Sequence, residues 1–249
     1  DIGKAIAIAF AAAKEQPFIR RQPEVIHHEF AMAGARSPAY STIVGSGDNA
    51  CILHYTQNNG QINDGDLILI DAGAEYQGYA ADITRTFPAN GKFTHAQREI
   101  YSLVLKAQKS VLDMLAPGVT LSQAMLHSAE IITQGLVDLG VLEGSVAENL
   151  ENESWRHFYM HGLGHFLGLD VHDVGNYKVE GEDRPLKPGM VITIEPGVYI
   201  SQDSDAPDKY KGIGVRIEDD VVITATGVEI LTSDVPKEID EIEALMAKS

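Results

Sequence analysis

The stretch DLILIDAG, residues 66–73, is an apolar run that ends on a carboxylate and then turns at glycine. The stretch MVITIEPG, residues 190–197, repeats this pattern with Glu195 in the place of Asp71. A short apolar run bounded by turn residues is typical of a buried strand. The two stretches therefore predict an architecture of two similar halves, each of which presents acidic side chains from the ends of its strands.

Two helix starts are marked by the capping-box pattern, in which a threonine is followed three residues later by a glutamine. Thr94 opens a helix that is expected to continue to about Leu115, and Thr120 opens a second one that continues to Gly140. In this motif the two side chains satisfy backbone N–H groups of the first turn, which have no partner inside the helix. These capping boxes are the best local signals in the chain.

Two further helices are predicted near the N-terminus. Residues 1–16 carry apolar side chains near helical spacing, and Pro23 can begin a second helix because proline suits the first turn. The apolar side of the second helix is expected to consist of Val25, Ile26, Phe30 and Met32.

The remaining segments are typical of strands separated by glycine and asparagine. Residues 41–60 predict two short strands, and residues 72–87 predict a strand, a turn and a returning strand. Beyond Trp155 the chain becomes rich in glycine and short apolar runs, which also predict strands. No linker divides the chain, so residues 1–249 are expected to form a single domain of the α+β class.

Composition excludes several classes of protein. The chain has 249 residues, of which 44% are hydrophobic, enough for one sizeable core, and no apolar run reaches the ~18 residues of a membrane span. The net charge of −17 argues against nucleic-acid binding, which needs a surplus of Lys and Arg. A single cysteine, Cys51, excludes an internal disulfide framework. With no visible signal peptide, these features predict a cytoplasmic protein that does not enter membranes.

Four carboxylates lie in apolar surroundings within or at the ends of predicted strands: Asp71, Asp82, Glu195 and Glu218. The ordinary interpretation is that each of them faces solvent. That interpretation weakens for four such residues together, because a buried carboxylate is costly unless it is paired or bound to a metal. The nearest candidate bases in the sequence are Arg85 and Arg216.

Three histidines cluster in the stretch HGLGHFLGLDVHD: His161, His165 and His172. The glycines between the first two make a helix doubtful, so their spacing of four residues is not evidence for a shared helical face. A lone histidine is usually an ordinary core or surface residue, but three among glycine and apolar residues favour a site. His54 lies in an apolar, strand-like stretch where an imidazole needs a partner.

Two Asp, two Glu and one His form an oxygen-rich ligand set. Such a set suits two divalent metals about 3.5–4 Å apart that share carboxylates and a hydroxide. Mn²⁺ fits this set better than a structural Zn²⁺, which favours Cys and His, while Zn²⁺ and Co²⁺ remain alternatives. The sequence has no GxSxG motif, no phosphate-binding GxxxxGK[ST] loop and no GxGxxG motif, so nothing supports serine nucleophiles or nucleotide binding.

The chain resembles the catalytic domain of the aminopeptidase P (Xaa-Pro aminopeptidase) family among the pita-bread metallopeptidases of M24 type. The matching stretches extend from residue 24 to residue 246 and are IHHEF, TIVGSGDNACILHYTQN, LILIDAGAEYQGYAADITRTFPANGKFT, MHGLGHFLGLDVHDVG, PGMVITIEPGVYI and GIGVRIEDDVVIT. The resemblance implies a pita-bread fold, with a curved antiparallel sheet, pseudo-twofold halves and helices on the outer face. It also implies that the chain is the C-terminal catalytic domain, without the N-terminal domain of full-length members.

The resemblance implies a role for each site residue. The family's metal ligands correspond to Asp71, Asp82, His165, Glu195 and Glu218. The substrate-pocket positions correspond to His54, His161, His172, Tyr199 and Arg216. In this family a hydroxide that bridges two metals attacks the Xaa-Pro carbonyl, and Glu195 matches the group that takes the proton of the water. A neighbouring histidine, His161 or His172, is expected to hydrogen-bond the carbonyl oxygen as charge develops on it.

The leading prediction is therefore an exopeptidase that releases the residue before proline from a peptide. Prolidase, which cleaves Xaa-Pro dipeptides, and a catalytically inactive pita-bread binding domain are the alternatives. An open site is favoured by the polar residues 201–212, expected to form a flexible rim loop, and Arg216 is expected to hold the peptide beyond proline. The resemblance also implies that the full-length protein assembles into a dimer or tetramer.

Overall fold

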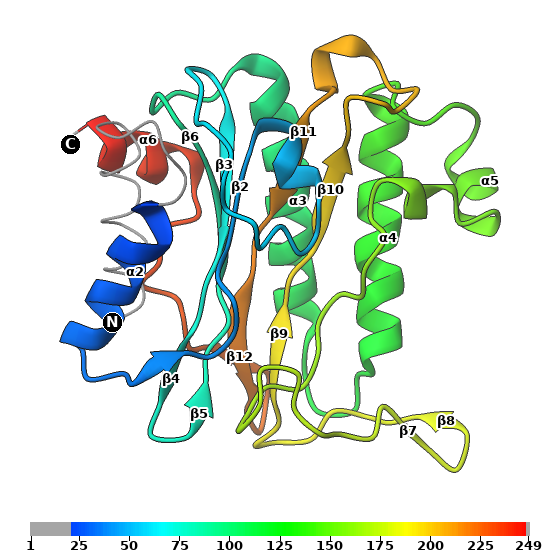
Figure 1. Ribbon diagram of the computed structural model, residues 1–249. Coiled ribbons are helices and arrows are strands. Elements are labelled where there is room, and N and C mark those ends of the chain that lie inside the picture. Colours follow the sequence, from blue (N-terminus) through cyan, green and yellow to red (C-terminus); the bar gives the residue numbers. More distant parts are fainter. Residues whose placement is uncertain (1–20, 248–249) are drawn as a thin grey trace.

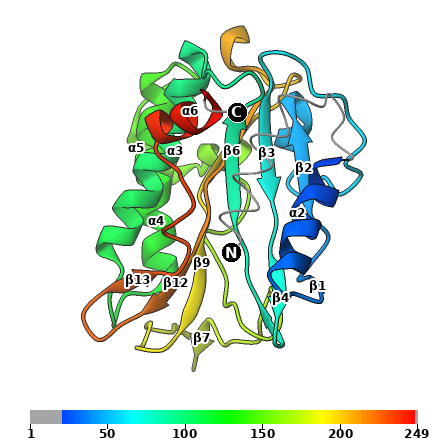
Figure 2. The ribbon, with the colours of Figure 1, turned by 90° about the vertical axis from the view of Figure 1, so that its left-hand side faces the viewer.

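The computed structural model describes residues 21–247, so the predicted helix over residues 1–16 lies outside the described residues. Short antiparallel sheets run through the middle of the molecule and helices flank them (Figure 1). Figure 2 shows α2 beside β2 and β3, and α3 and α4 beside β9, β12 and β13. This arrangement is the α+β class that the sequence predicts.

The first half of the molecule is built on a three-stranded antiparallel sheet in the order β2–β3–β6. Its strands are β2 (Ile43–Ser46), β3 (Leu67–Asp71) and β6 (Thr84–Pro88). Every residue of these strands is buried, as expected for a sheet covered on both faces. The register places Asp71, the last residue of β3, opposite Thr84, the first residue of β6.

The second half repeats this plan in the order β13–β12–β9. Its strands are β9 (Val191–Ile194), β12 (Asp219–Ile223) and β13 (Val228–Ile230). In each half a hairpin separates two acidic residues: β4 (Ala74–Tyr76) with β5 (Tyr79–Ala80), and β10 (Gly197–Ile200) with β11 (Ile213–Arg216). The first hairpin lies between Asp71 and Asp82, and the second between Glu195 and Glu218. The prediction of two similar halves is confirmed.

The two halves meet where β11 lies beside β3 and β6. The Thr86 hydroxyl donates to the carbonyl oxygen of Arg216 at 3.0 Å, and Thr84 accepts a hydrogen bond from the N–H of Glu218 through its carbonyl oxygen at 3.1 Å. These bonds bring the acidic strand ends of both halves to one place.

The two long helices begin where the capping boxes predict. Thr94 caps α3 (His95–Met114) and Thr120 caps α4 (Leu121–Asp138), and both reciprocal bonds are present in each box. The helices pack closely because Gly135 faces Leu103: a Cβ at this glycine would lie only 2.3 Å from a Leu103 methyl carbon. α3 also packs against β9, β10 and β11, and so covers the outer side of the sheets.

The remaining elements are short or lie at the edges of the fold. They are α2 (Arg21–Met32), β1 (Ser37–Pro38), η1 (Gly47–Cys51), α5 (Val146–Glu151), η2 (Ser154–His157), β7 (Lys178–Val179), β8 (Glu182–Asp183), η3 (Asp208–Tyr210) and α6 (Ile239–Ala247). Within the described residues, no helix combines the length and the apolar character that crossing a membrane requires.

Two local predictions differ from the structure near the N-terminus. Pro23 lies within the described part of α2, which begins at Arg21, the first described residue, so the start of this helix at Pro23 stays a prediction. Met32 is 73% exposed and lies outside the buried side of that helix. In residues 41–60 only β2 forms, and the second predicted strand is replaced by η1, which turns so tightly that a Cβ on Gly45 would lie 2.8 Å from the Asn49 carbonyl oxygen.

The expected rim loop also differs. Residues 201–212 join β10 to β11 at the end of the hairpin where Ile200 pairs with Ile213. The opposite, acidic end, where Gly197 pairs with Arg216, lies about 10 Å away along the strands at roughly 3.3 Å per residue. Tyr210 in this loop is fully buried and donates a hydrogen bond to Glu99 at 2.8 Å. The loop is therefore anchored to α3, and it gives no support to an open substrate site.

Candidate metal centre

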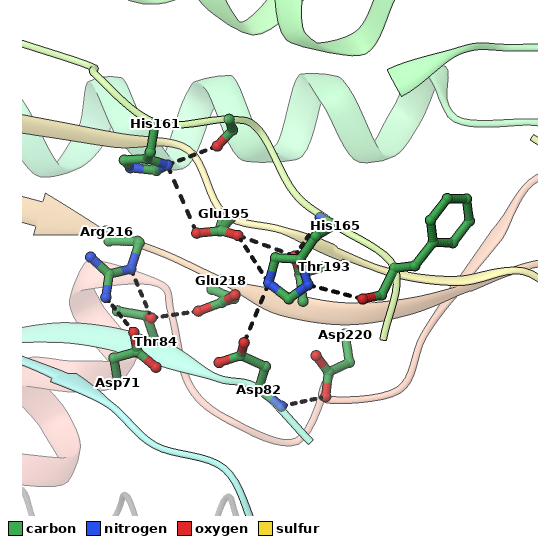
Figure 3. A network of polar contacts seen from close by, with 12 residues as sticks. Asp71, Asp82, Thr84, His161, His165, Thr193, Glu195, Arg216, Glu218 and Asp220 are labelled. Atoms are coloured by element: carbon green, nitrogen blue, oxygen red, sulfur yellow. Dashed lines mark hydrogen bonds and ion pairs between the residues drawn. The ribbon is translucent and has the colours of Figure 1, made fainter. Parts of the chain in front are cut away.

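The acidic strand ends of both halves converge on one small cavity of about 70 Å³. All five predicted metal ligands line it: Asp71, Asp82, His165, Glu195 and Glu218. Beside them lie Leu53, His54, His161, His172 and Arg216. Of the predicted site residues only Tyr199 does not line the cavity. Figure 3 shows the acidic side chains pointing toward one another from the two halves.

Three of these residues already form a compact donor group. One ligand atom each from Asp82, His165 and Glu218 lies within 4.8 Å of the other two. His165 Nε2 lies 3.5 Å from Asp82 Oδ2 and 3.4 Å from Glu195 Oε1. Nδ1 of His165 hydrogen-bonds the Phe166 carbonyl oxygen at 3.0 Å, an orientation that turns Nε2 toward the carboxylates.

Local sequence explains how His165 reaches this position. Residues 163–167 run extended beside β9, as shown by the hydrogen bond from the Glu195 N–H to the Leu163 carbonyl oxygen at 2.8 Å. A Cβ at Gly164 would lie 1.9 Å from the Thr193 carbonyl oxygen, so only glycine allows this approach. The absence of a helix between His161 and His165 agrees with the sequence prediction.

The charges of the cluster are not balanced by the side chains within it. Burial raises the pKa of Glu218, Glu195 and Asp82, and the neighbouring carboxylates raise it further. Burial alone would lower the pKa of His165, but its hydrogen bond to Asp82 and the charge of Glu195 raise it to about 9. The excess of negative charge thus favours protonated carboxylates and a protonated imidazole. A divalent metal ion would neutralise such a donor set. The residues therefore fit a metal.

Each glutamate of the cluster is held by a threonine. The Thr84 hydroxyl donates to Glu218 Oε2 at 2.5 Å, and the Thr193 hydroxyl donates to Glu195 Oε1 at 3.2 Å. The sequence analysis missed both threonines. The sequence did contain a signal for them. Thr84 stands two residues after Asp82, and Thr193 stands two residues before Glu195. In extended chain, residues two apart point to the same face.

Tyr40 is a second residue that the sequence analysis missed. Its hydroxyl oxygen lies 2.5 Å from Oδ1 of Asp71 and 2.5 Å from Oδ1 of Asp82. The nearer of these partners is 31 residues away in the sequence, and no motif around Tyr40 marks it. Burial and the charges of Asp71 and Asp82 raise the pKa of the Tyr40 hydroxyl well above its usual value, so it keeps its proton as a donor.

Arg216 is the only Lys or Arg side chain in the described residues that forms an ion pair with one of the five predicted ligands. It is 3% exposed. Its Nη2 lies 2.5 Å from Asp71 Oδ2, its Nε donates to Thr84 Oγ1 at 3.1 Å, and its Nη1 donates to Tyr199 Oη at 3.0 Å. All three nitrogens thus have protein partners.

The same chain of hydrogen bonds reaches His161. Because Tyr199 Oη accepts from Arg216, its own proton is directed to His161 Nε2, 2.7 Å away. His161 Nδ1 donates to the Gly162 carbonyl oxygen at 2.7 Å. Burial, with the charge of Arg216 adding to it, lowers the pKa of His161 to about 3. His161 is therefore neutral, and both of its nitrogens are occupied.

His54 and His172 have a different character. Both are exposed, and neither forms a hydrogen bond through its ring nitrogens to any residue between 21 and 247. His54 lies in a turn after η1, so the strand-like conformation expected for its surroundings is wrong. His172 packs edge-on against His165, with 4.4 Å between ring centroids.

Comparisons with known proteins point to a single family. A sequence model described as metallopeptidase family M24 matches residues 3–225. A Haemophilus influenzae protein named Xaa-Pro aminopeptidase is 60% identical over 221 residues, which are 89% of this chain and 51% of that protein. The chain thus spans about half the length of this relative.

Solved structures agree. Proline aminopeptidase P II from Yersinia pestis superposes with a TM-score of 0.94 at 52% identity, covering 99% of this chain and 58% of that one. An Escherichia coli aminopeptidase P variant in complex with substrate superposes with a TM-score of 0.93 at 53% identity, covering 99% of this chain and 57% of that one. The likeness confirms the predicted pita-bread fold.

Proposed function

The chain belongs to metallopeptidase family M24, and on that premise we propose that it is the catalytic part of a metal-dependent exopeptidase that releases the N-terminal residue before proline. The observation that carries the proposal is the convergence of two Asp, two Glu and one His on one cavity, where four carboxylates face a single Arg side chain, Arg216. The names of the relatives, which match this chain over nearly its whole length, support the choice of the Xaa-Pro bond.

The metal would be held by Asp71, Asp82, His165, Glu195 and Glu218. We propose two divalent ions, with Mn²⁺ ahead of Zn²⁺ and Co²⁺, because four carboxylates and one imidazole form a mostly oxygen donor set. Bound divalent ions supply a lowered pKa for a coordinated water and polarisation of the scissile carbonyl. Asp82 and Glu218 come from the two halves and share the compact donor group with His165, so a metal held there would draw ligands from both halves.

Glu195 is proposed to accept the proton of the attacking water. Its Oε1 is held by Thr193, while its Oε2 accepts no hydrogen bond from any residue between 21 and 247. The side chain is 17% exposed to the cavity, so solvent can reach it. A carboxylate oxygen without a hydrogen-bond partner can accept the proton of a water in the cavity.

The histidines divide into two roles. His172 and His54 line the cavity with ring nitrogens that have no partner in the described residues, so we propose that they donate to substrate carbonyl oxygens. His161 also belongs to the proposed substrate pocket, but both of its ring nitrogens already have partners. We therefore propose that its ring forms a wall that contacts the proline ring, and that it does not donate a hydrogen bond to substrate. Such a wall suits the substrate because the Xaa-Pro amide has no N–H to be recognised.

The decisive experiment uses the full-length protein with its metal content measured. We expect chelation to abolish hydrolysis of Ala-Pro-Ala and added Mn²⁺ to restore it. We also expect a higher kcat/KM for Ala-Pro-Ala than for Ala-Pro. Full activity in protein shown by elemental analysis to be metal-free would overturn the metal site, and a tenfold or greater preference for the dipeptide would make the protein a prolidase.

A further inference from the structure

Two adjacent carboxylates on β12 have opposite surroundings. Successive side chains of a strand point to opposite faces, so Asp219 and Asp220 face different sides of the sheet. Asp219 Oδ1 lies 2.7 Å from Arg85 Nη2, and its Oδ2 lies 2.6 Å from Lys237 Nζ. The charge of Asp219 is therefore compensated twice, and this side chain ties β6 and the segment after β13 to β12.

Asp220 is equally buried, with 4% exposure, but no Lys or Arg among residues 21–247 forms an ion pair with it. Its Oδ1 has no hydrogen-bond partner in the described part of the chain. It lines a mostly apolar cavity of about 470 Å³, whose wall includes Ile83, Leu167 and Val191. A carboxylate in such a place costs free energy, and an apolar side chain of similar shape would suit the fold better.

The one side-chain hydrogen bond that Asp220 forms leads to the candidate metal centre. Its Oδ2 accepts from the backbone N–H of Asp82 at 3.0 Å, across 138 residues of sequence (Figure 3). Asp82 lies between β5 and β6, outside any strand. Backbone hydrogen bonds to residues 74 and 72 hold its neighbours Ala81 and Ile83, while the N–H of Asp82 itself is held by Asp220. The carboxylate of Asp82 is part of the compact donor group with His165 and Glu218.

We propose that Asp220 is a positioning residue for the metal centre, which holds the backbone of Asp82 so that its carboxylate faces His165 and Glu218. This inference rests on the proposed metal-dependent function. The bond joins a strand of the second half to a ligand of the first half, and so fixes the distance between the ligands that the two halves contribute. Partners that orient metal ligands in this way typically change metal affinity about 10–100-fold when they are removed.

The test compares Asp220→Leu with Asp220→Asn in the full-length protein. Leucine matches the shape and suits the apolar wall, but it cannot accept a hydrogen bond, whereas the asparagine oxygen can take the place of Oδ2. Asp234→Ala is the matched control, because Asp234 is an exposed acid in the wall of the same cavity. Mn²⁺ is titrated into metal-free protein by calorimetry, and the melting temperature of each metal-free variant is measured.

We expect Asp220→Leu to bind Mn²⁺ about 10–100-fold more weakly while its metal-free melting temperature does not fall. Asp220→Asn and Asp234→Ala should keep wild-type affinity. Should the leucine variant fail to fold, Asp220→Ala takes its place in the same comparison with asparagine.

Unchanged Mn²⁺ affinity in Asp220→Leu would overturn the proposal, and so would an equal loss of affinity in the asparagine variant. A loss of affinity accompanied by an equivalent loss of metal-free stability would also overturn it, because that result describes a purely structural residue. Failure of the wild-type protein to bind Mn²⁺ would instead overturn the metal site itself, so the two ideas fail separately.

Discussion

Arg216 and Asp71 form a buried ion pair, with Nη2 of the arginine 2.5 Å from Oδ2 of the aspartate. The expectation that Arg216 holds the peptide beyond proline stays a prediction, but its contacts favour another role. Its three nitrogens are committed to Asp71, Thr84 and Tyr199, so it supplies the cation that this end of the acidic cluster needs. Arg216 also donates to the Tyr199 hydroxyl oxygen, so the hydroxyl hydrogen of Tyr199 points toward His161.

Replacement of Arg216 by methionine should therefore weaken the fold and the reaction without altering peptide selectivity. Removing one partner of a buried ion pair costs about 3–5 kcal/mol, because the other charge is left buried and unpaired. Urea unfolding measures this cost, with Lys211→Met, which breaks a pair with the exposed Asp208, as the control. Activity on Ala-Pro-Ala and on Ala-Pro should fall by the same factor. A loss confined to the tripeptide would restore the role of Arg216 in holding the peptide.

Replacement of Glu195 by glutamine keeps the shape but removes the charge and the base. We expect kcat to fall by at least 10²–10⁴-fold, the range that general-base catalysis typically supplies. Elemental analysis must accompany the kinetics, because Glu195 is also a proposed metal ligand. Glu182→Gln, an exposed change on β8, is the control. A variant that retains metal and stays within tenfold of wild type would show that another group takes the proton.

The pH dependence of the reaction should not report His161. Burial, with the nearby charge of Arg216, lowers its pKa to about 3, so it gains a proton only in strong acid and is neutral throughout the neutral range. In His161→Gln we therefore expect kcat/KM to fall while both limbs of its pH profile stay in place. The profile is measured with Ala-Pro-Ala, with the exposed change His157→Gln as the control. A limb that disappears in His161→Gln would mean that this imidazole is ionised during the reaction.

The helix cap at Thr94 offers a test of the fold that is independent of the site. Thr94→Ala removes the hydroxyl that accepts the Gln97 N–H at 3.3 Å, and loss of such a cap costs about 0.5–2 kcal/mol. Thermal unfolding should show a melting temperature lower by roughly 2–4 °C per kcal/mol for a domain of this size. Ser102→Ala, an exposed change within α3, should have almost no effect. Equal shifts in both variants would mean that the cap adds nothing beyond helix propensity.

Several features of the fold and site follow from the sequence because their causes are local. Both capping boxes act across three residues, so Thr94 and Thr120 predict their helices regardless of the rest of the chain. Strand ends such as Asp71 and Glu195 follow from apolar runs and turn residues. The five metal-ligand positions stand in motifs that resemble a known family. Where the same reasoning was wrong, as for the second strand in residues 41–60, a tight turn over Gly45 overrode an apolar pattern.

The sequence by itself determined which side chains carry charge, where the two capped helices begin and which apolar runs become the strands that lead to Asp71 and Glu195. Only the tertiary structure decided which charge meets which partner. Arg216 pairs with Asp71 across 145 residues, and Tyr40 reaches two aspartates at once. Of two adjacent acids, Asp219 pairs with two cations, while Asp220 pairs with no Lys or Arg of residues 21–247. The physical reason is that a strand alternates its side chains between two faces, so the burial and the partners of each depend on what packs against that face. Such packing is set by register between distant strands, which no local pattern of residues records.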